Sequence, residues 1–189
     1  MSISARSRSN SAGTLSPEYP LLGLLARQPA HGYELHQKLD SDLGQVWHLS
    51  LSQVYNILNR LESQDLIVGE VEEQVKLPAR RRYRLTPAGQ ARFDSWLQTP
   101  TRSSGRAIRV EFTTRLYFAA AADPQLAWQV IDDQIAATQV GLNQLEHSLS
   151  EIPPGQVFNR LGADLRLRQL ASILSWLNQC ITFLEGPTG

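Results

Sequence analysis

Apolar positions recur at helical spacing in the stretch "SLSQVYNILNRLESQDLI", residues 50–67. These positions are Leu51, Val54, Leu58 and Leu61. Steps of three and four predict a helix with one face in a core. The other face carries short amides and hydroxyls, whereas solvated helix faces are usually rich in Lys and Glu, which are better helix formers. The outer face is therefore a candidate binding surface.

Two further short helices are predicted before this one. In "SPEYPLLGLLARQ", Ser16 is placed as N-cap and Pro17 in the first turn, ahead of four leucines. In "HGYELHQKLDSDLG", the helix ends at Gly44. Its predicted buried positions are Tyr33, Leu35, Leu39 and Leu43. Three short helices with tight connections are the order of a helix-turn-helix unit.

A β-hairpin is predicted next, in "LIVGEVEEQVKLPARRRYRLTPAG". Tyr83 and Leu85 alternate with arginines, which is the period of a half-exposed strand, and the connecting loop contains Pro78. Thr86 and Pro87 are an N-cap and a first helical position. The following helix presents Phe93, Trp96 and Leu97. The pattern predicts a winged helix over residues 15–98, preceded by a flexible tail over 1–14.

The second half of the chain is predicted to be almost wholly helical. Residues 99–107 have the composition of a linker, and 108–186 form a helical region that is broken at Pro153 and Pro154. Apolar residues there step by three and four without a break, which is typical of a coiled-coil seam. The fold class is therefore mainly α: a winged helix-turn-helix with a two-stranded wing, then a helical, coiled-coil region.

The last helix is apolar over too wide an arc for one partner helix to cover, so a second subunit is predicted. A second stripe, including Cys180 and Phe183, lies beside its seam. A monomeric three-helix bundle is the alternative. The predicted dimerisation residues are Trp128, Ile131, Ile135, Leu142, Leu145, Leu149, Leu170, Leu174, Leu177 and Ile181.

Composition and charge limit the functions and the location that are expected for this chain. The chain has 189 residues, 42% of them hydrophobic, and 18 Lys+Arg balance 18 Asp+Glu, so a role with nucleic acid must rest on local patches. No apolar run approaches the roughly 20 residues of a membrane span. The Ser-rich start has no apolar segment of a secretory signal, and one cysteine fits a reducing compartment. A cytoplasmic location is expected. The tail is read as flexible, with a DNA-groove arm as the alternative.

No constellation for catalysis, metal binding or cofactor binding is recognisable. The four histidines are scattered, and His31 is expected to be a turn or cap residue. Cys180 lies on an apolar face, where an inert thiol is expected. Asp132 and Asp133 are adjacent on a helix and point in different directions. No catalytic residue, metal ligand or cofactor is therefore assigned.

The run "ARRRYR" concentrates positive charge on the predicted hairpin. These arginines either contact DNA phosphates or pair with Glu70, Glu72 and Glu73 of the opposing strand. On the candidate binding helix, Asn and Gln can bond adenine, Arg guanine, and Ser either base. The candidate DNA-binding residues are Ser52, Gln53, Tyr55, Asn56, Asn59, Arg60, Arg80, Arg81, Arg82 and Arg84.

The motifs "LGLL", "PAHGYEL", "VYNILNRLE" and "YRLTPAG" occur in this order, and the chain resembles the PadR family of transcriptional regulators over residues 15–97. The segment "RVEFTTRLYFAAAADPQ" is similar to the start of the helical C-terminal region of some members. The resemblance implies a dimeric DNA-binding repressor. The two-fold symmetry of such a dimer predicts a pseudo-palindromic operator. Val54 replaces a common Leu, and Asp65 replaces a common Gly in the turn after the binding helix.

The resemblance also implies that the C-terminal helices sense a small molecule. Four aromatic residues are candidates for a small aromatic effector: Phe112, Tyr117, Trp128 and Trp176. The alternative is that these rings are core. For the whole chain, the alternatives to a DNA-binding regulator are a winged-helix adaptor that binds protein, and an enzyme with an unrecognised site.

Overall fold

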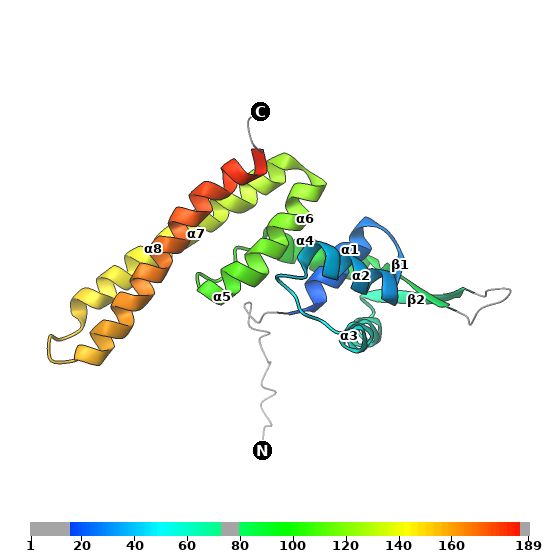
Figure 1. The fold of residues 1–189 in the computed structure, drawn as a ribbon, viewed down its shortest axis with the longest axis horizontal. Helices are drawn as coiled ribbons and strands as arrows, with labels where there is room; N and C mark the ends of the chain where they lie inside the picture. The colour runs from blue at the N-terminus through cyan, green and yellow to red at the C-terminus, as the bar shows by residue number, and fades with distance from the viewer. Residues whose placement is uncertain (1–15, 73–79, 186–189) are drawn as a thin grey trace, which may run out of the picture.

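The computed structural model describes residues 16–72 and 80–185. It has two parts: a winged-helix unit with a protruding hairpin, and a helical unit that ends in two long helices (Figure 1). The mainly α fold class predicted from the sequence is confirmed. The predicted tail over 1–14, the loop around Pro78 and the side chains of Glu73 and Phe183 lie outside the described residues.

Three helices form the base of the winged-helix unit. They are α1 (Glu18–Arg27), α2 (Gly32–Leu43) and α3 (Leu51–Ser63). Pro17 rather than Ser16 occupies the N-cap of α1, so the predicted start is one residue early. His31 caps α2, as predicted, and its backbone N–H donates to the Glu34 carboxylate at 2.9 Å.

The core of this unit is built from the predicted apolar positions, with two corrections. Val54, Leu58 and Leu61 are fully buried. Leu51 is 36% exposed because it stands in the first turn of α3, where a side chain tilts toward the open helix end. Tyr33 is 53% exposed because it lies two residues before Leu35, roughly 200° around the helix from the buried face. The sequence pattern predicts both as core residues, and for these two positions it is wrong.

The wing is a three-stranded antiparallel sheet with the order β1-β3-β2. The predicted hairpin consists of β2 (Ile67–Glu72) and β3 (Arg80–Leu85). The additional strand, β1 (Ala30–His31), pairs with β3 and was not predicted, because two residues are too short to show an alternation. This strand joins the start of α2 directly to the base of the wing.

Helix α4 (Pro87–Gln98) follows the wing and closes the unit against α1. Its predicted start is confirmed: the Thr86 hydroxyl accepts a hydrogen bond from the Gly89 N–H at 3.1 Å, and Pro87 is the first helical residue. Phe93, Trp96 and Leu97 are buried, as predicted.

The helical unit begins with a continuous run. It comprises α5 (Gly105–Ala107), the π-helical turn η1 (Ile108–Phe112) and α6 (Thr113–Ala122). The π-helical turn was not predicted; such turns occur frequently at functional sites. Thr101, within the stretch that composition marks as a linker, is buried against α7 rather than loose.

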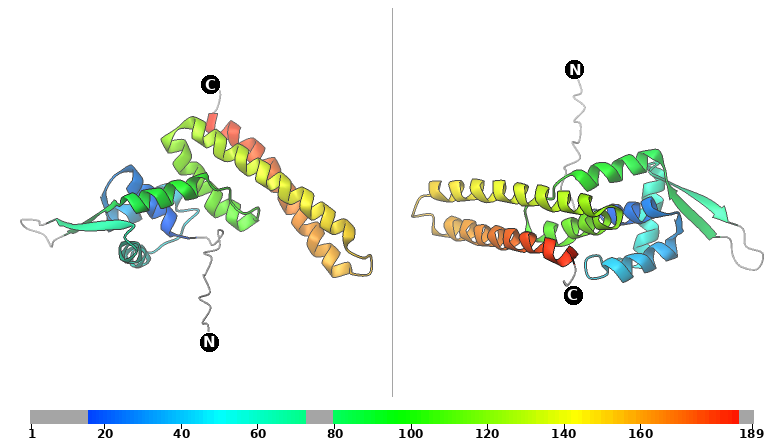
Figure 2. Two further views of the ribbon diagram at one scale, coloured as in Figure 1. Left: turned by 180° about the vertical axis from the view of Figure 1, so that it is seen from behind. Right: turned by 90° about the horizontal axis from the view of Figure 1, so that it is seen from above.

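Two long helices complete the chain, α7 (Pro124–Glu151) and α8 (Val157–Glu185). The Asp123 carboxylate caps α7 by accepting from the Gln125 N–H at 2.9 Å, and the Pro153–Pro154 break separates the helices as predicted. They run antiparallel and side by side over their length (Figure 2). Across the described part of the chain, no helix is long and apolar enough to span a bilayer.

Candidate nucleic-acid interface

The outer face of α3 presents the predicted polar groups to solvent. The exposed residues are Ser52, Gln53, Tyr55, Asn56, Asn59 and Arg60. The helix begins with a reciprocal cap: Ser50 Oγ accepts from the Gln53 N–H at 3.3 Å, and Gln53 Oε1 accepts from the Ser50 N–H at 2.8 Å. The cap therefore uses the amide oxygen of Gln53 and leaves its Nε2 group as the donor on the exposed surface.

Arg60 is half exposed, and its guanidinium is bonded to α1. Its Nε donates to Glu18 Oε1 at 2.7 Å, and Arg92 donates to the other oxygen of the same carboxylate at 2.8 Å. The Glu18 side chain is only 7% exposed, so these two cations compensate a nearly buried charge. The Glu18 carboxylate thereby links α3 to α1 and, through Arg92, to α4, which orients the exposed face of α3.

On the wing, each of three arginines meets a carboxylate. Arg84 pairs with Glu70 at 2.9 Å, and Arg82 pairs with Glu72 at 3.3 Å, both across β2 and β3. Arg81 reaches past the strand to Glu62 of α3 at 2.6 Å. The cross-strand pairing that the sequence left open therefore exists for Arg82 and Arg84. Arg81 instead pairs with Glu62, which the hairpin pattern did not suggest.

These ion pairs leave the arginine side chains accessible from solvent. The three guanidinium side chains are 46–52% exposed, and exposed pairs are worth only about 0–1 kcal/mol. Arg80, opposite Glu72 in the strand register, is also exposed. Arg81 therefore lies against α3 through its contact with Glu62, whereas Arg80, Arg82 and Arg84 lie on the other face of β3.

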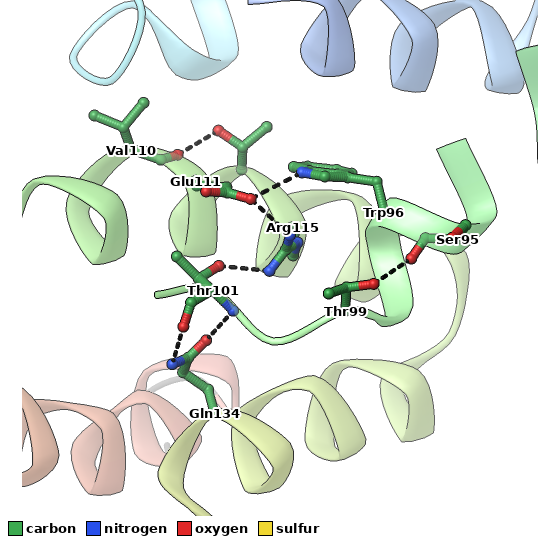
Figure 3. Close-up of polar contacts among 9 residues, drawn as sticks. Ser95, Trp96, Thr99, Thr101, Val110, Glu111, Arg115 and Gln134 are labelled. Carbon is green, nitrogen blue, oxygen red and sulfur yellow. Dashed lines mark hydrogen bonds and ion pairs between the residues drawn. The ribbon is translucent and has the colours of Figure 1, made fainter. Parts of the chain in front are cut away.

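A buried polar cluster joins the winged-helix unit to the helical unit (Figure 3). Glu111 Oε1 accepts from Trp96 Nε1 at 3.1 Å and from Arg115 at 2.6 Å, and Arg115 also donates to the Thr101 hydroxyl at 2.6 Å. Gln134 of α7 holds the Thr101 backbone at both its N–H and its carbonyl. Burial lowers the pKa of the Arg115 guanidinium, and the adjacent Glu111 carboxylate opposes that shift.

A second polar joint connects α6 to the first half of the chain. Trp47 donates to the Thr114 hydroxyl at 2.7 Å, and Tyr117 donates to the Asp42 carboxylate of α2. Burial raises the pKa of Tyr117, and the bond to Asp42 raises it further. Burial opposes ionisation of Asp42, but hydrogen bonds led by that from Tyr117 outweigh it and lower its pKa to about 2. The helical unit is therefore coupled to the helix that precedes α3.

Two family models match these two parts of the chain. The model of the transcriptional regulator PadR-like family matches residues 21–95, and the model of the virulence activator alpha C-terminal region matches residues 108–185. The winged-helix part of the chain, residues 21–95, belongs to the PadR-like family of transcriptional regulators. The family recognised from the sequence motifs is thereby confirmed.

The PadR-like chain is similar to named regulators. It is 27% identical to the negative transcriptional regulator PadR of Bacillus subtilis, across 71% of this chain and 74% of that protein. It is 25% identical to a probable transcriptional regulator of Mycobacterium tuberculosis, across 51% of this chain and 53% of that protein. The crystal structure of B. subtilis PadR in complex with operator DNA has 24% identity and a TM-score of 0.45, over 88% of this chain and 96% of that chain.

The structure shows how the two departures from the PadR pattern are accommodated. Asp65 has a φ of 56°, in the left-handed region that Asp tolerates better than most residues. Its carbonyl accepts a hydrogen bond from the Thr86 hydroxyl at 2.7 Å, which ties the turn to the start of α4. Val54 is fully buried.

In this PadR-like chain, the predicted dimerisation residues lie mainly between α7 and α8 of one chain. Five are buried: Leu142, Leu145 and Leu170 form a separate cluster between α7 and α8, whereas Ile131 and Leu177 belong to the main core. The other five are half-buried: Trp128, Ile135, Leu149, Leu174 and Ile181. Large apolar residues that are exposed occur on another face of α8: Val157, Phe158, Leu161, Leu165 and Trp176. The sequence pattern identified the intrachain seam, and a contact of these residues with a second subunit stays a prediction.

The four predicted effector residues lie in different surroundings. Phe112 is fully buried and meets Trp176 edge to face at 5.9 Å between centroids, whereas the Tyr117 hydroxyl bonds Arg27 and Asp42. Trp128 is half-buried on α7. The small cavity beside Phe112 has a volume of about 10 Å³, the space of a single water molecule.

The remaining candidate chemistry is structural. Within residues 16–72 and 80–185, no group of three or more His, Cys, Asp or Glu side chains is arranged to hold a metal ion. Cys180 is buried, and burial raises the pKa of its thiol to about 11, which keeps it protonated and unreactive. His36 and His31 each bond a backbone carbonyl.

Proposed function

We propose that the chain is a sequence-specific DNA-binding transcriptional regulator: a homodimeric repressor that a small molecule releases from its operator. The observation that carries this proposal is the division of α3 into two faces. Val54, Leu58 and Leu61 are fully buried, whereas the amides of Asn56 and Asn59 face solvent beside an arginine-bearing wing. Such groups in the major groove read bases, and arginines on phosphates supply affinity.

The DNA-binding mode follows from this geometry. Helix α3 enters the major groove with Ser52, Gln53, Tyr55, Asn56 and Asn59 facing base edges. On binding, the wing arginines exchange their exposed glutamate partners for phosphates. Breaking an exposed arginine–glutamate pair costs little free energy in water, so this exchange is easy. Arg60 acts through its bond to Glu18, which holds α3 in position.

The homodimer is proposed to form through the helical unit. Phe158, Leu161, Leu165 and Trp176 lie on one stripe of α8, exposed by 87%, 59%, 57% and 38%. A two-fold axis that pairs this stripe with its copy would cover it and present two α3 helices to DNA. The operator is then pseudo-palindromic, with half-sites separated by whole turns of roughly 34 Å.

The effector is proposed to be a small aromatic molecule that acts on the helical unit. B. subtilis PadR has been crystallised in complex with p-coumaric acid. In the present chain, Phe112 and Trp176 are in ring contact, and Tyr117 belongs to the joint with α2. A molecule that displaces these rings would disturb the position of α2.

We further propose that the chain divides into a tail (1–14), a winged helix (15–98), a linker (99–107) and a helical region (108–186), and that the protein is cytoplasmic.

The test is selection of duplexes from a randomised library by the full chain, followed by gel shift with the selected sequence and with the promoter of the chain's own gene. We expect an enriched site with two inverted half-sites, and light scattering that gives twice the mass of the chain. Retention of unselected duplexes with the same affinity would refute sequence-specific recognition. A panel of aromatic acids added to the complex then identifies a molecule that releases DNA.

A further inference from the structure

We propose that Tyr33, at the start of α2, is an additional DNA contact that donates its phenolic proton to a backbone phosphate. This inference rests on the proposed function, because it concerns the same DNA-binding face. The sequence pattern placed Tyr33 in the core, but the structure leaves it 53% exposed.

The position of Tyr33 is fixed from two sides. The preceding residues, Ala30 and His31, form strand β1 and pair with Tyr83 and Arg82 of the wing strand β3. His31 is further held by contacts of its ring with the Arg81 carbonyl at 3.1 Å and with Glu72 at 3.4 Å. The first turn of α2 therefore cannot move independently of the arginine-bearing strand.

On the other side, the same turn is packed against α3. A Cβ atom added to Gly32 would lie 2.5 Å from Tyr55 Cε1 and 3.2 Å from Leu58 Cδ1. Only a residue without a side chain allows this approach, so the Tyr55 ring lies directly over the start of α2. Tyr33 thus follows immediately after a residue that touches the DNA-facing helix, and two residues after one that pairs with the wing.

This position faces a predictable part of the DNA. When α3 occupies the major groove, the preceding helix of a helix-turn-helix unit crosses the sugar–phosphate backbone. The start of α2 lies between α3 and the wing, so the strand that runs between their contacts passes in front of it. Tyr side chains are among the groups that bond phosphate oxygens at such places.

The phenol of Tyr33 is also oriented for donation. Gln37, one turn later, donates its Nε2–H to the Tyr33 oxygen at 2.9 Å. A phenol oxygen that accepts this bond still has its own proton to donate, and the ring is exposed to solvent. A phosphate is a charged acceptor, for which hydrogen bonds are stronger than for neutral ones.

The experiment compares the full-length wild type with Tyr33→Phe and Gln37→Glu on two duplexes, one selected by the wild type and one unselected. Tyr33→Phe is expected to weaken both by about tenfold and to leave their affinity ratio unchanged, because phosphates carry no sequence information. The slope of log affinity against log salt should also stay unchanged, since a neutral phenol releases no counterion. Gln37→Glu adds a negative charge and should weaken both duplexes at least as much.

Tyr19→Phe is the matched control, because that phenol is on α1 with its ring stacked on Trp96 at 4.5 Å. It should bind both duplexes like the wild type. If Tyr33→Phe or Gln37→Glu binds both duplexes with wild-type affinity, the inference about Tyr33 is refuted and the proposed function is unaffected. If the loss is confined to the selected duplex, the assignment of Tyr33 to a phosphate is refuted. A wild-type protein that binds no duplex overturns the proposed function and this inference together.

Discussion

The buried pair between Glu111 and Arg115 provides a stringent test of how the two units are joined. Their side chains are only 10% and 4% exposed, and Glu111 Oε1 lies 2.6 Å from the nearest guanidinium nitrogen of Arg115. Glu111→Gln keeps an oxygen that can accept from Trp96 and from the guanidinium, but removes the negative charge. Arg115 would then be a buried cation without its counter-charge. Breaking a buried pair in this way costs about 3–5 kcal/mol.

We expect the lower end of this range, about 3 kcal/mol, because the introduced amide can retain the two hydrogen bonds. The assay is urea unfolding at one fixed protein concentration, followed by circular dichroism, with the m-value checked for constancy. The matched control is Asp164→Asn, which removes the acid from an exposed pair with Arg168 at the same spacing. That control should unfold like the wild type.

A double variant separates the charge effect from a general loss of packing. Glu111→Gln with Arg115→Met removes both charges and keeps an acceptor for the Trp96 N–H, so it should recover most of the loss. A loss below about 1 kcal/mol in Glu111→Gln, or no recovery in the double variant, would refute the reasoning that a desolvated ion pair holds this joint. Two buried atoms of the pair, Glu111 Oε2 and Arg115 Nε, have no hydrogen-bond partner among the described residues.

Three further predictions concern other parts of the chain. Asn56→Ala should cost about 1–3 kcal/mol on the selected duplex and relax the preference at one base pair, measured by competition binding; equal loss on random DNA would contradict the role of α3. Gly89→Ala should destabilise the fold by more than about 1 kcal/mol in urea, because its Cβ would lie 1.9 Å from the Leu66 carbonyl oxygen. Asp42, whose pKa is lowered from 3.8 to about 2, stabilises the native state above pH 3.8, and this contribution is lost as the pH falls toward 2. Tyr117→Phe should weaken that acid dependence, measured by unfolding across the same pH range.

Local sequence patterns were sufficient for most of the helices and their ends. Thr86 and Pro87 mark the start of α4, and Asp123 with Pro124 marks the start of α7, because capping depends on a few adjacent residues. The buried face of α3 follows from its period. The exposed polar residues of α3 follow from the same period, so this part of the candidate interface was visible in the sequence.

The pairing partners of charged groups were only partly predictable. Cross-strand neighbours follow from a hairpin, and Glu70 and Glu72 are indeed the partners of Arg84 and Arg82. The contact of Arg81 with Glu62 crosses from a strand to a helix. No local period encodes such a contact.

The amino-acid sequence alone therefore determined the order of the main helices and the two hairpin strands, the faces of α3 and the family, since each of these depends on residues close together in the chain. Tertiary structure alone revealed that the start of α2 lies between the wing and α3, because β1 is too short to be recognised without its partner strand. It also revealed that the coiled-coil pattern is largely satisfied between α7 and α8 of one chain. A heptad pattern specifies that a face is buried, but the partner that buries it depends on how the helices are arranged in space.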